Sequence, residues 1–169
     1  MIGVRPARGG KCGGSLINSR FVISAAHCFD KVGPRARSNT IHVYFGRHHR
    51  QLKGTKYAVE EVIFHPGRPG KTDATKNDPH DIALLRLTKD AELSSMVSLV
   101  CLPSGPQDSP PPGTRALVSG WGRNENDTSS DKLQYNCVHV ISLDECKERG
   151  VVLSTMMDTD SCVAVRSEG

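Results

Sequence analysis

Short apolar segments rich in β-branched and aromatic residues recur along the chain, separated by polar stretches that contain glycine or proline. Such segments are typical of β-strands. They predict strands at residues 21–24, 41–45, 57–64, 82–87, 116–120 and 135–141. In 57–64 the apolar positions do not alternate strictly, which indicates a bend or bulge. The pattern therefore favours a protein built mainly of strands.

One segment has the pattern of a helix start instead. Ser142 stands three residues before Glu145 in a capping-box arrangement, and acidic residues precede cationic ones in 142–149. We expect a short helix that ends near Gly150. Residues 104–113 are rich in proline and glycine and predict a loop, and residues 1–11 predict a surface loop or a ragged end.

Composition limits the classes of partner. Lys and Arg number 22 against 18 Asp and Glu, which gives a formal net charge of +4 over 169 residues. Because no long run of like charge appears and the cations are not interleaved with aromatic residues, we expect no nucleic-acid partner. No apolar stretch is long enough to span a membrane, so no membrane partner is expected either.

The cysteine content points to the compartment. Six cysteines in a chain of this size favour disulfide bonds, which persist mainly in oxidising compartments. We therefore expect an extracellular, secreted protein, although the N-terminus has no apolar core of signal-peptide length.

A candidate for catalysis stands at the end of the first predicted strand. His27 follows an apolar run and directly precedes Cys28. The imidazole would therefore lie on a turn that a disulfide could hold rigid. Since the ordinary pKa of histidine lies near neutrality, a fixed imidazole is a candidate general base.

Four further groups of residues each occur once, and their order along the chain is informative. They are Cys12-Gly13-Gly14-Ser15-Leu16-Ile17 with Ser24-Ala25-Ala26-His27-Cys28, Asp81-Ile82-Ala83-Leu84-Leu85-Arg86-Leu87, Cys101-Leu102-Pro103 and Ser119-Gly120-Trp121-Gly122. In this order they resemble the landmarks of the chymotrypsin/trypsin-like serine proteases, with truncation at both ends. Four ordered landmarks over most of the chain are far more specific than any one of them.

The resemblance implies an all-β fold of two six-stranded β-barrels with one short helix. Such a fold normally takes roughly 200–250 residues, so the second barrel is expected to be incomplete. The implied division is a first barrel at 1–100, a linker at 101–112 and part of a second barrel at 113–169.

The resemblance also implies catalytic roles. His27 would accept and return a proton, and Asp81 would orient the imidazole. The nucleophilic serine should stand in Gly-Asp-Ser-Gly-Gly, which this sequence lacks, and Ser167 is without the required glycine-rich turn. We predict a fragment of a secreted serine endopeptidase, inactive by itself, whose parent acts on proteins or peptides and can meet protease inhibitors. The alternative is a non-catalytic protease homologue acting as a binding or regulatory module.

By position in the family, the resemblance implies the disulfides Cys12–Cys28 and Cys146–Cys162. Cys101 and Cys137 remain, and they could pair with each other or with partners beyond the chain ends. Asn126 begins an Asn-Asp-Thr sequon and is a predicted glycosylation site in a secreted protein.

No metal or other cofactor is expected. Some relatives hold Ca²⁺ with carboxylates in the loop that corresponds to residues 47–56, and here that loop contains no acid. The adjacent histidines His48 and His49 are a weak candidate for a transition metal, because neighbouring side chains on a strand point to opposite faces.

Overall fold

The computed structural model describes residues 2–6, 11–30, 40–52, 54–68, 80–122 and 128–149, together with the backbone of 162–164. The chain forms two compact units. The first comprises Met1–Cys101 and Trp121–Leu133, and the second comprises Leu102–Gly120 and Gln134–Gly169. Among the described residues, no helix is both long and apolar enough to cross a membrane.

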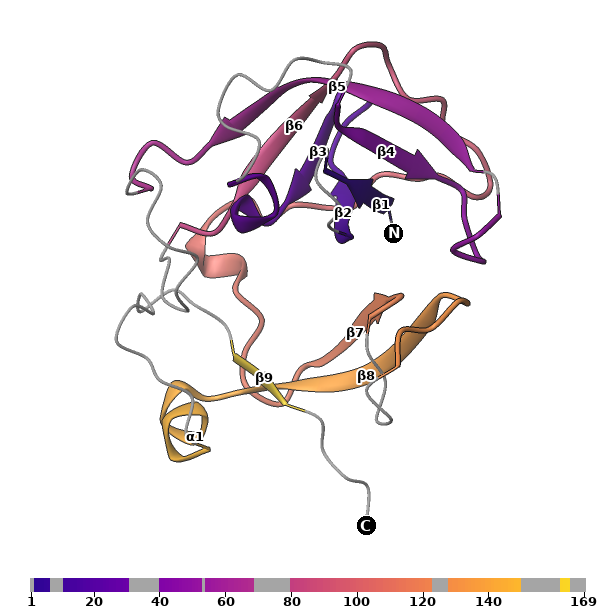
Figure 1. The fold of residues 1–169 in the computed structure, drawn as a ribbon. Coiled ribbons are helices and arrows are strands. Elements are labelled where there is room, and N and C mark those ends of the chain that lie inside the picture. The colour runs from indigo at the N-terminus through magenta and orange to yellow at the C-terminus, as the bar shows by residue number, and fades with distance from the viewer. Residues whose placement is uncertain are drawn as a thin grey trace. The chain divides into compact units, whose positions relative to one another are not determined.

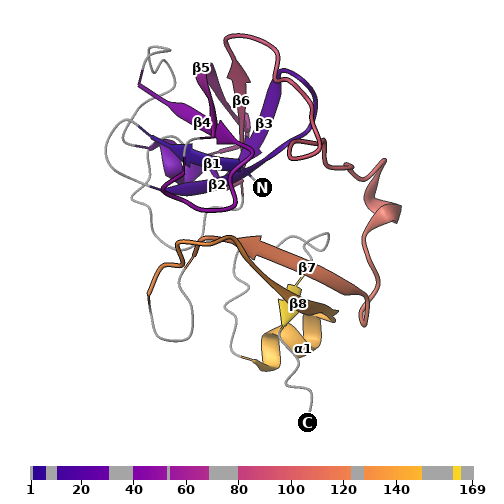
Figure 2. The same cartoon turned by 90° about the vertical axis from the view of Figure 1, so that its right-hand side faces the viewer.

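The first unit is a closed six-stranded barrel. Its strands are β1 (Ile2–Arg5), β2 (Cys12–Leu16), β3 (Phe21–Ser24), β4 (His42–Phe45), β5 (Thr55–Phe64) and β6 (Ala83–Leu87). Neighbours pair in the order β1-β2-β3-β6-β5-β4, and the ladder closes between β4 and β1, as Figures 1 and 2 show from two directions. Closure leaves the barrel without an edge strand.

Burial inside this barrel alternates with the period of a strand. In β6 Ala83, Leu85 and Leu87 are buried, whereas Leu84 and Arg86 are only partly covered. The alternation places every second residue on the core face, and each large aliphatic side chain so buried contributes about 1.5–3 kcal/mol. Phe45 and Tyr57 pack edge to face in the same core, with ring centroids 5.0 Å apart.

The bulge predicted for residues 57–64 is present in β5. The β5–β6 register passes from Val59 opposite Leu87 to Glu61 opposite Arg86, which leaves Glu60 as the extra residue. Both glutamates reach one guanidinium, since Glu61 lies 2.9 Å and Glu60 3.5 Å from nitrogens of Arg86. The bulge thus brings two consecutive carboxylates to the same cation.

The N-terminal prediction of a loop or ragged end was wrong for residues 2–5. They form β1, which pairs with β2 on one side and β4 on the other. Ile2 and Val4 are buried in the core. Two apolar positions among glycine, arginine and proline are too few to reveal a strand locally, and tertiary pairing decides the conformation.

The second unit contains a three-stranded sheet in the order β7-β8-β9, drawn in orange and yellow in Figure 1. Its elements are η2 (Pro106–Asp108), β7 (Arg115–Gly120), β8 (Gln134–Ile141), α1 (Leu143–Glu148) and β9 (Cys162–Ala164). The predicted helix is confirmed with its cap, because Ser142 Oγ accepts a hydrogen bond from the Glu145 N–H. The predicted fold class is therefore correct: mainly β, one closed barrel, an incomplete second β unit and one short helix.

The segment Trp121–Leu133 belongs to the first unit. Trp121 Nε1 and the Leu133 backbone N–H both donate to the carbonyl oxygen of His48, at 3.1 and 2.7 Å. The Arg50 N–H donates to the carbonyl of Asp131. A division of the chain by sequence position alone places this segment with the second barrel, whereas its hydrogen bonds hold it to the loop after β4.

Candidate active site

The register of two neighbouring strands brings the predicted catalytic residues together. Strands β3 and β6 are antiparallel, with Ser24 opposite Ala83. The chain leaves β3 just before His27 and enters β6 just after Asp81. The two residues therefore lie at the same end of the same strand pair, within the first unit.

Asp81 holds His27 at two points. Its Oδ2 lies 2.6 Å from Nδ1 of the imidazole, and its Oδ1 accepts a hydrogen bond from the His27 backbone N–H at 2.8 Å. Because a carboxylate can only accept, the ring proton resides on Nδ1. One side chain thus fixes the tautomer, the ring plane and the backbone that carries the ring.

The other ring nitrogen is left to act as a base. His27 Nε2 lies 3.7 Å from the sulfur of Cys28, which is bound in a disulfide and has no proton to donate. The imidazole side chain is 56% exposed and the Asp81 side chain 36%. Among the described residues no donor occupies Nε2, and the neutral ring can accept a proton there.

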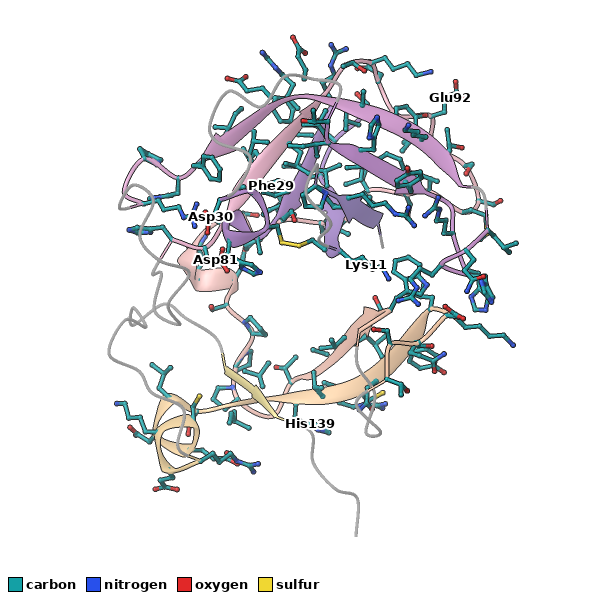
Figure 3. All side chains as sticks on the ribbon, in the orientation of Figure 1. Lys11, Phe29, Asp30, Asp81, Glu92 and His139 are labelled. Carbon is teal, nitrogen blue, oxygen red and sulfur yellow. A yellow bond between two sulfur atoms is a disulfide. The ribbon has the colours of Figure 1, made fainter. Side chains whose placement is uncertain are left out.

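The turn that carries His27 is fixed from both flanks. His27 lies in the 3-10 helix η1 (Ala26–Phe29), where Ala26 and Phe29 are fully buried in the barrel core. The predicted disulfide between Cys12 and Cys28 is present and ties this turn to β2; it is the yellow sulfur–sulfur bond in Figure 3. Buried anchors before and after His27 leave the imidazole as the exposed member of the turn.

The same cluster does not suit a metal ion. Ligand atoms of Cys12, His27 and Cys28 lie within 4.8 Å of one another. The two sulfurs are joined in a disulfide, and metal ions bind cysteine as the thiolate. His27 Nδ1 is also taken by Asp81. The donors that remain are too few for a metal centre.

Two side chains of the loop after β4 bind the carboxylate of Asp131, which lies far along the sequence. Arg50 Nη2 lies 2.9 Å from one oxygen of Asp131, and Gln51 Nε2 donates to the other at 3.1 Å. The hydrogen bond from Arg50 lowers the pKa of Asp131, Gln51 and the charge of Arg50 add to this, and partial desolvation opposes it. His49 Nδ1 accepts from the Gln51 N–H at 3.4 Å, an ordinary local contact for one of the two adjacent histidines.

Of the remaining predicted residues, the structure describes the side chains of three cysteines and not those of the others. Cys101 and Cys137 are both free, so they do not pair with each other, and Arg115 donates to the sulfur of Cys137 at 3.4 Å. Cys146 is buried and disulfide-bonded. The side chain of its predicted partner Cys162, the sequon residue Asn126 and Ser167 lie outside the described residues.

Comparisons with known proteins agree with the fold and the order of landmarks. The trypsin family model matches residues 2–168. Trypsin-3 of Salmo salar is 37% identical over 152 residues, which cover 86% of this chain and 57% of the trypsin. Phenoloxidase-activating factor 1 of Holotrichia diomphalia is 33% identical over 80% of this chain and 40% of that protein. The crystal structure of scabies mite inactivated protease paralogue S-D1 superposes with a TM-score of 0.79 and 26% identity, covering 98% of this chain and 69% of that one.

The fold and these matches are those of the chymotrypsin/trypsin-like serine proteases. With a family model spanning nearly its whole length, the chain belongs to the trypsin family. The chain spans little more than half the length of the trypsins it matches.

Proposed function

We propose that this chain is the part of a secreted serine endopeptidase that carries the general base and its orienting carboxylate. The contact of 2.6 Å between His27 Nδ1 and Asp81 Oδ2 is the main support, because it leaves Nε2 as the basic nitrogen. The serine nucleophile would come from a Gly-Asp-Ser-Gly-Gly segment, which these 169 residues do not contain.

Peptide-bond hydrolysis would then proceed in two halves. Nε2 of His27 takes the proton of the serine hydroxyl while the serine oxygen bonds to the peptide carbonyl carbon. The imidazolium gives this proton to the leaving amine nitrogen as the carbon–nitrogen bond breaks. In the second half, water loses a proton to Nε2 as its oxygen bonds to the acyl carbon, and the imidazolium returns this proton to the serine oxygen as the acyl–serine bond breaks. Asp81 stabilises the imidazolium in both halves without itself taking a proton.

Cellular location and partners follow from the same proposal. The Cys12–Cys28 disulfide supports an oxidising, extracellular compartment. The substrates are proteins or peptides, and proteinaceous protease inhibitors are expected to bind the same site. Asn126, in its sequon, is the proposed glycosylation site.

The direct test uses the full-length parent protein. Asp81→Asn is expected to lower kcat for a peptide ester by about 10⁴-fold, because an amide favours the wrong imidazole tautomer. His27→Ala should be comparably inactive. His49→Gln, a histidine in the loop after β4, is the control and should keep wild-type kcat/KM. Wild-type activity in Asp81→Asn would refute the proposed roles.

The 169-residue chain itself gives a second test. It is expected to show no hydrolysis of arginyl, lysyl or aromatic esters and no labelling by a fluorophosphonate, because it has no activated serine. Hydrolysis that a fluorophosphonate abolishes would show that a serine within these residues is the nucleophile and would refute this assignment.

A non-catalytic homologue that acts as a binding or regulatory module is the second candidate. Its support is the similarity to a structure described as an inactivated protease paralogue, together with the missing Gly-Asp-Ser-Gly-Gly segment. The intact His27–Asp81 contact favours the enzyme instead, since a module freed from catalysis needs neither residue. Sequencing the transcript beyond residue 169 distinguishes them by the presence or absence of that segment.

A further inference from the structure

The short turn at residues 65–68, directly after β5, contacts the segments that carry both proposed catalytic residues. Neither His27 nor Asp81 lies in this turn. Its side chains instead reach Asp30, which follows η1, and His80, which precedes Asp81. The connections involve an ion pair on one side and stacked rings on the other.

The ion pair holds the end of η1. Arg68 Nη2 lies 2.8 Å from Asp30 Oδ1, and the two side chains are only 13% and 19% exposed. Asp30 is the C-terminal cap of η1, where its backbone N–H reaches the carbonyl oxygen of His27 at 3.5 Å. The Arg68 guanidinium also lies over the ring of Phe64, 5.1 Å from its centre. Removal of Arg68 would leave a largely buried carboxylate without this cation, at the residue that ends the His27 turn.

The stacked rings hold the residue before Asp81. The imidazoles of His65 and His80 are nearly parallel, with centroids 4.2 Å apart and an interplanar angle of 18°. His65 Nδ1 accepts a hydrogen bond from the Gly67 N–H at 3.1 Å, which orients this ring. On the other side, the carbonyl oxygen of His80 accepts from the Ile82 N–H at 2.7 Å, which tightens the backbone around Asp81.

Close packing makes Gly67 part of the same arrangement. A Cβ at this position would lie 2.9 Å from Nε2 of His80 and 3.3 Å from Cε1 of His65. Both rings therefore pack against the backbone of the turn. Any side chain at Gly67 would displace at least one of them.

We propose that the 65–68 turn positions the His27–Asp81 pair, with Arg68 holding the His27 turn through Asp30 and His65 holding the Asp81 segment through His80. These are positioning residues, which act on the proposed catalytic pair without touching substrate. The inference rests on the proposed function for its role in catalysis, but the geometric dependence can be measured without any hydrolysis.

The experiment follows the Nδ1 proton of His27 by ¹⁵N-edited NMR on the purified 169-residue chain. In Arg68→Gln and in His65→Ala, exchange of this proton with water should accelerate about tenfold or more. The reason is that each change would weaken the hydrogen bond from the His27 ring to the Asp81 carboxylate. Arg68→Lys and His65→Phe keep the charge and the stacking ring, respectively, and should restore part of the protection. Thermal unfolding of each variant shows that it is folded at the temperature of measurement.

Arg20→Gln is the matched control. Arg20 pairs with Asp90 at 3.3 Å in the same barrel, directly before β3 and therefore at the opposite end of that strand from His27. Its loss should leave the exchange of the His27 proton unchanged. Acceleration in Arg20→Gln equal to that in Arg68→Gln would mean general loosening and would overturn the proposal. So would exchange in Arg68→Gln and His65→Ala that matches the wild-type chain.

Failure of the two proposals can be told apart. In an active parent protein, Arg68→Gln and His65→Ala should lower kcat with little change in KM, because positioning of the base acts on the chemical step. A parent without hydrolytic activity whose His27 proton still depends on Arg68 and His65 would refute the proposed function and leave the positioning role standing.

Discussion

Single residues near the site serve more than one purpose, and Asp81 is the clearest example. One carboxylate oxygen meets the imidazole of His27 and the other meets the backbone N–H of the same residue. Ring orientation and local backbone geometry are therefore coupled. A substitution at position 81 would change both, so its effect on the proposed activity would report more than the loss of one hydrogen bond.

Asp131 gives a residue-scale prediction on pH. Its pKa is lowered in the folded chain, first by the hydrogen bond from Arg50, so the unfolded state binds its proton more readily. The stabilisation is therefore complete above the ordinary aspartate pKa, near 3.9, and is lost as the pH falls through the lower folded value. In urea unfolding, wild type should exceed Asp131→Asn in stability at pH 6, and the difference should shrink below about pH 4.

The partner provides the control for this pH dependence. Arg50→Gln should remove the same pH-dependent difference, and the double variant should add nothing further, because both changes break one interaction. A stability difference between wild type and Asp131→Asn that stays constant from pH 6 to about pH 3 would contradict the prediction.

Phe29 allows a second prediction about a single side chain. It is fully buried, belongs to the same 3-10 helix as His27 and is labelled in Figure 3. Phe29→Ala should lower the free energy of unfolding by about 3–5 kcal/mol, because it removes buried apolar area and leaves a cavity. Leu52→Ala, at a side chain that is 61% exposed, should change it by less than about 0.5 kcal/mol. Similar values for both variants in urea unfolding would show that Phe29 is not a core anchor.

At the scale of elements, the disulfide between β2 and η1 is expected to stabilise the barrel by constraining the unfolded chain. It closes a sequence separation of 16 residues. Replacing both Cys12 and Cys28 by serine should cost about 3 kcal/mol in the free energy of unfolding. Cys101→Ser, at an exposed free thiol, should be neutral. A loss well below 1 kcal/mol in the double variant, measured by denaturant titration, would contradict this account.

Elements governed by local pattern could be predicted from the sequence. Strand β3 has the predicted bounds, because a short run rich in β-branched and aromatic residues favours a strand. Helix α1 begins where Ser142 caps Glu145, a rule that acts within four residues. Strand β1 could not be predicted this way, since Ile2 and Val4 gain their burial from β2 and β4, which come later in the chain.

In the candidate site, too, some features could be predicted from local sequence and others depend on the fold. His27 stands out by its place after an apolar run, whereas Asp81 was assigned through the family resemblance and not through spacing. No sequence pattern predicts the contacts of Arg68 with Asp30 or of His65 with His80. They join residues distant in sequence, and a lone arginine or histidine in a loop is an ordinary surface residue until the fold is known.

At the scale of the whole molecule, the two units differ in how much apolar surface they bury. The barrel has a continuous core with contributions from all six strands. In the second unit β8 buries Val138, Val140 and Ile141, whereas Leu117 is 69% exposed and Tyr135 75% exposed on neighbouring strands. A strand pair with less buried apolar area opens at lower free energy than one that lines a core.

We therefore expect unequal protection in native-state hydrogen exchange of the 169-residue chain. The mutually bonded amides of β3 and β6 should exchange only through the largest opening of the molecule, whereas those between β7 and β8 should exchange at a lower free energy. Val22→Ala, in the barrel core, is the internal control: it should lower the exchange free energy in β3 and β6 and leave β7 and β8 unchanged. Equal exchange free energies in both sheets, shifted together by Val22→Ala, would mean that the two units unfold as one cooperative body, and the difference in their burial would then have no consequence for stability.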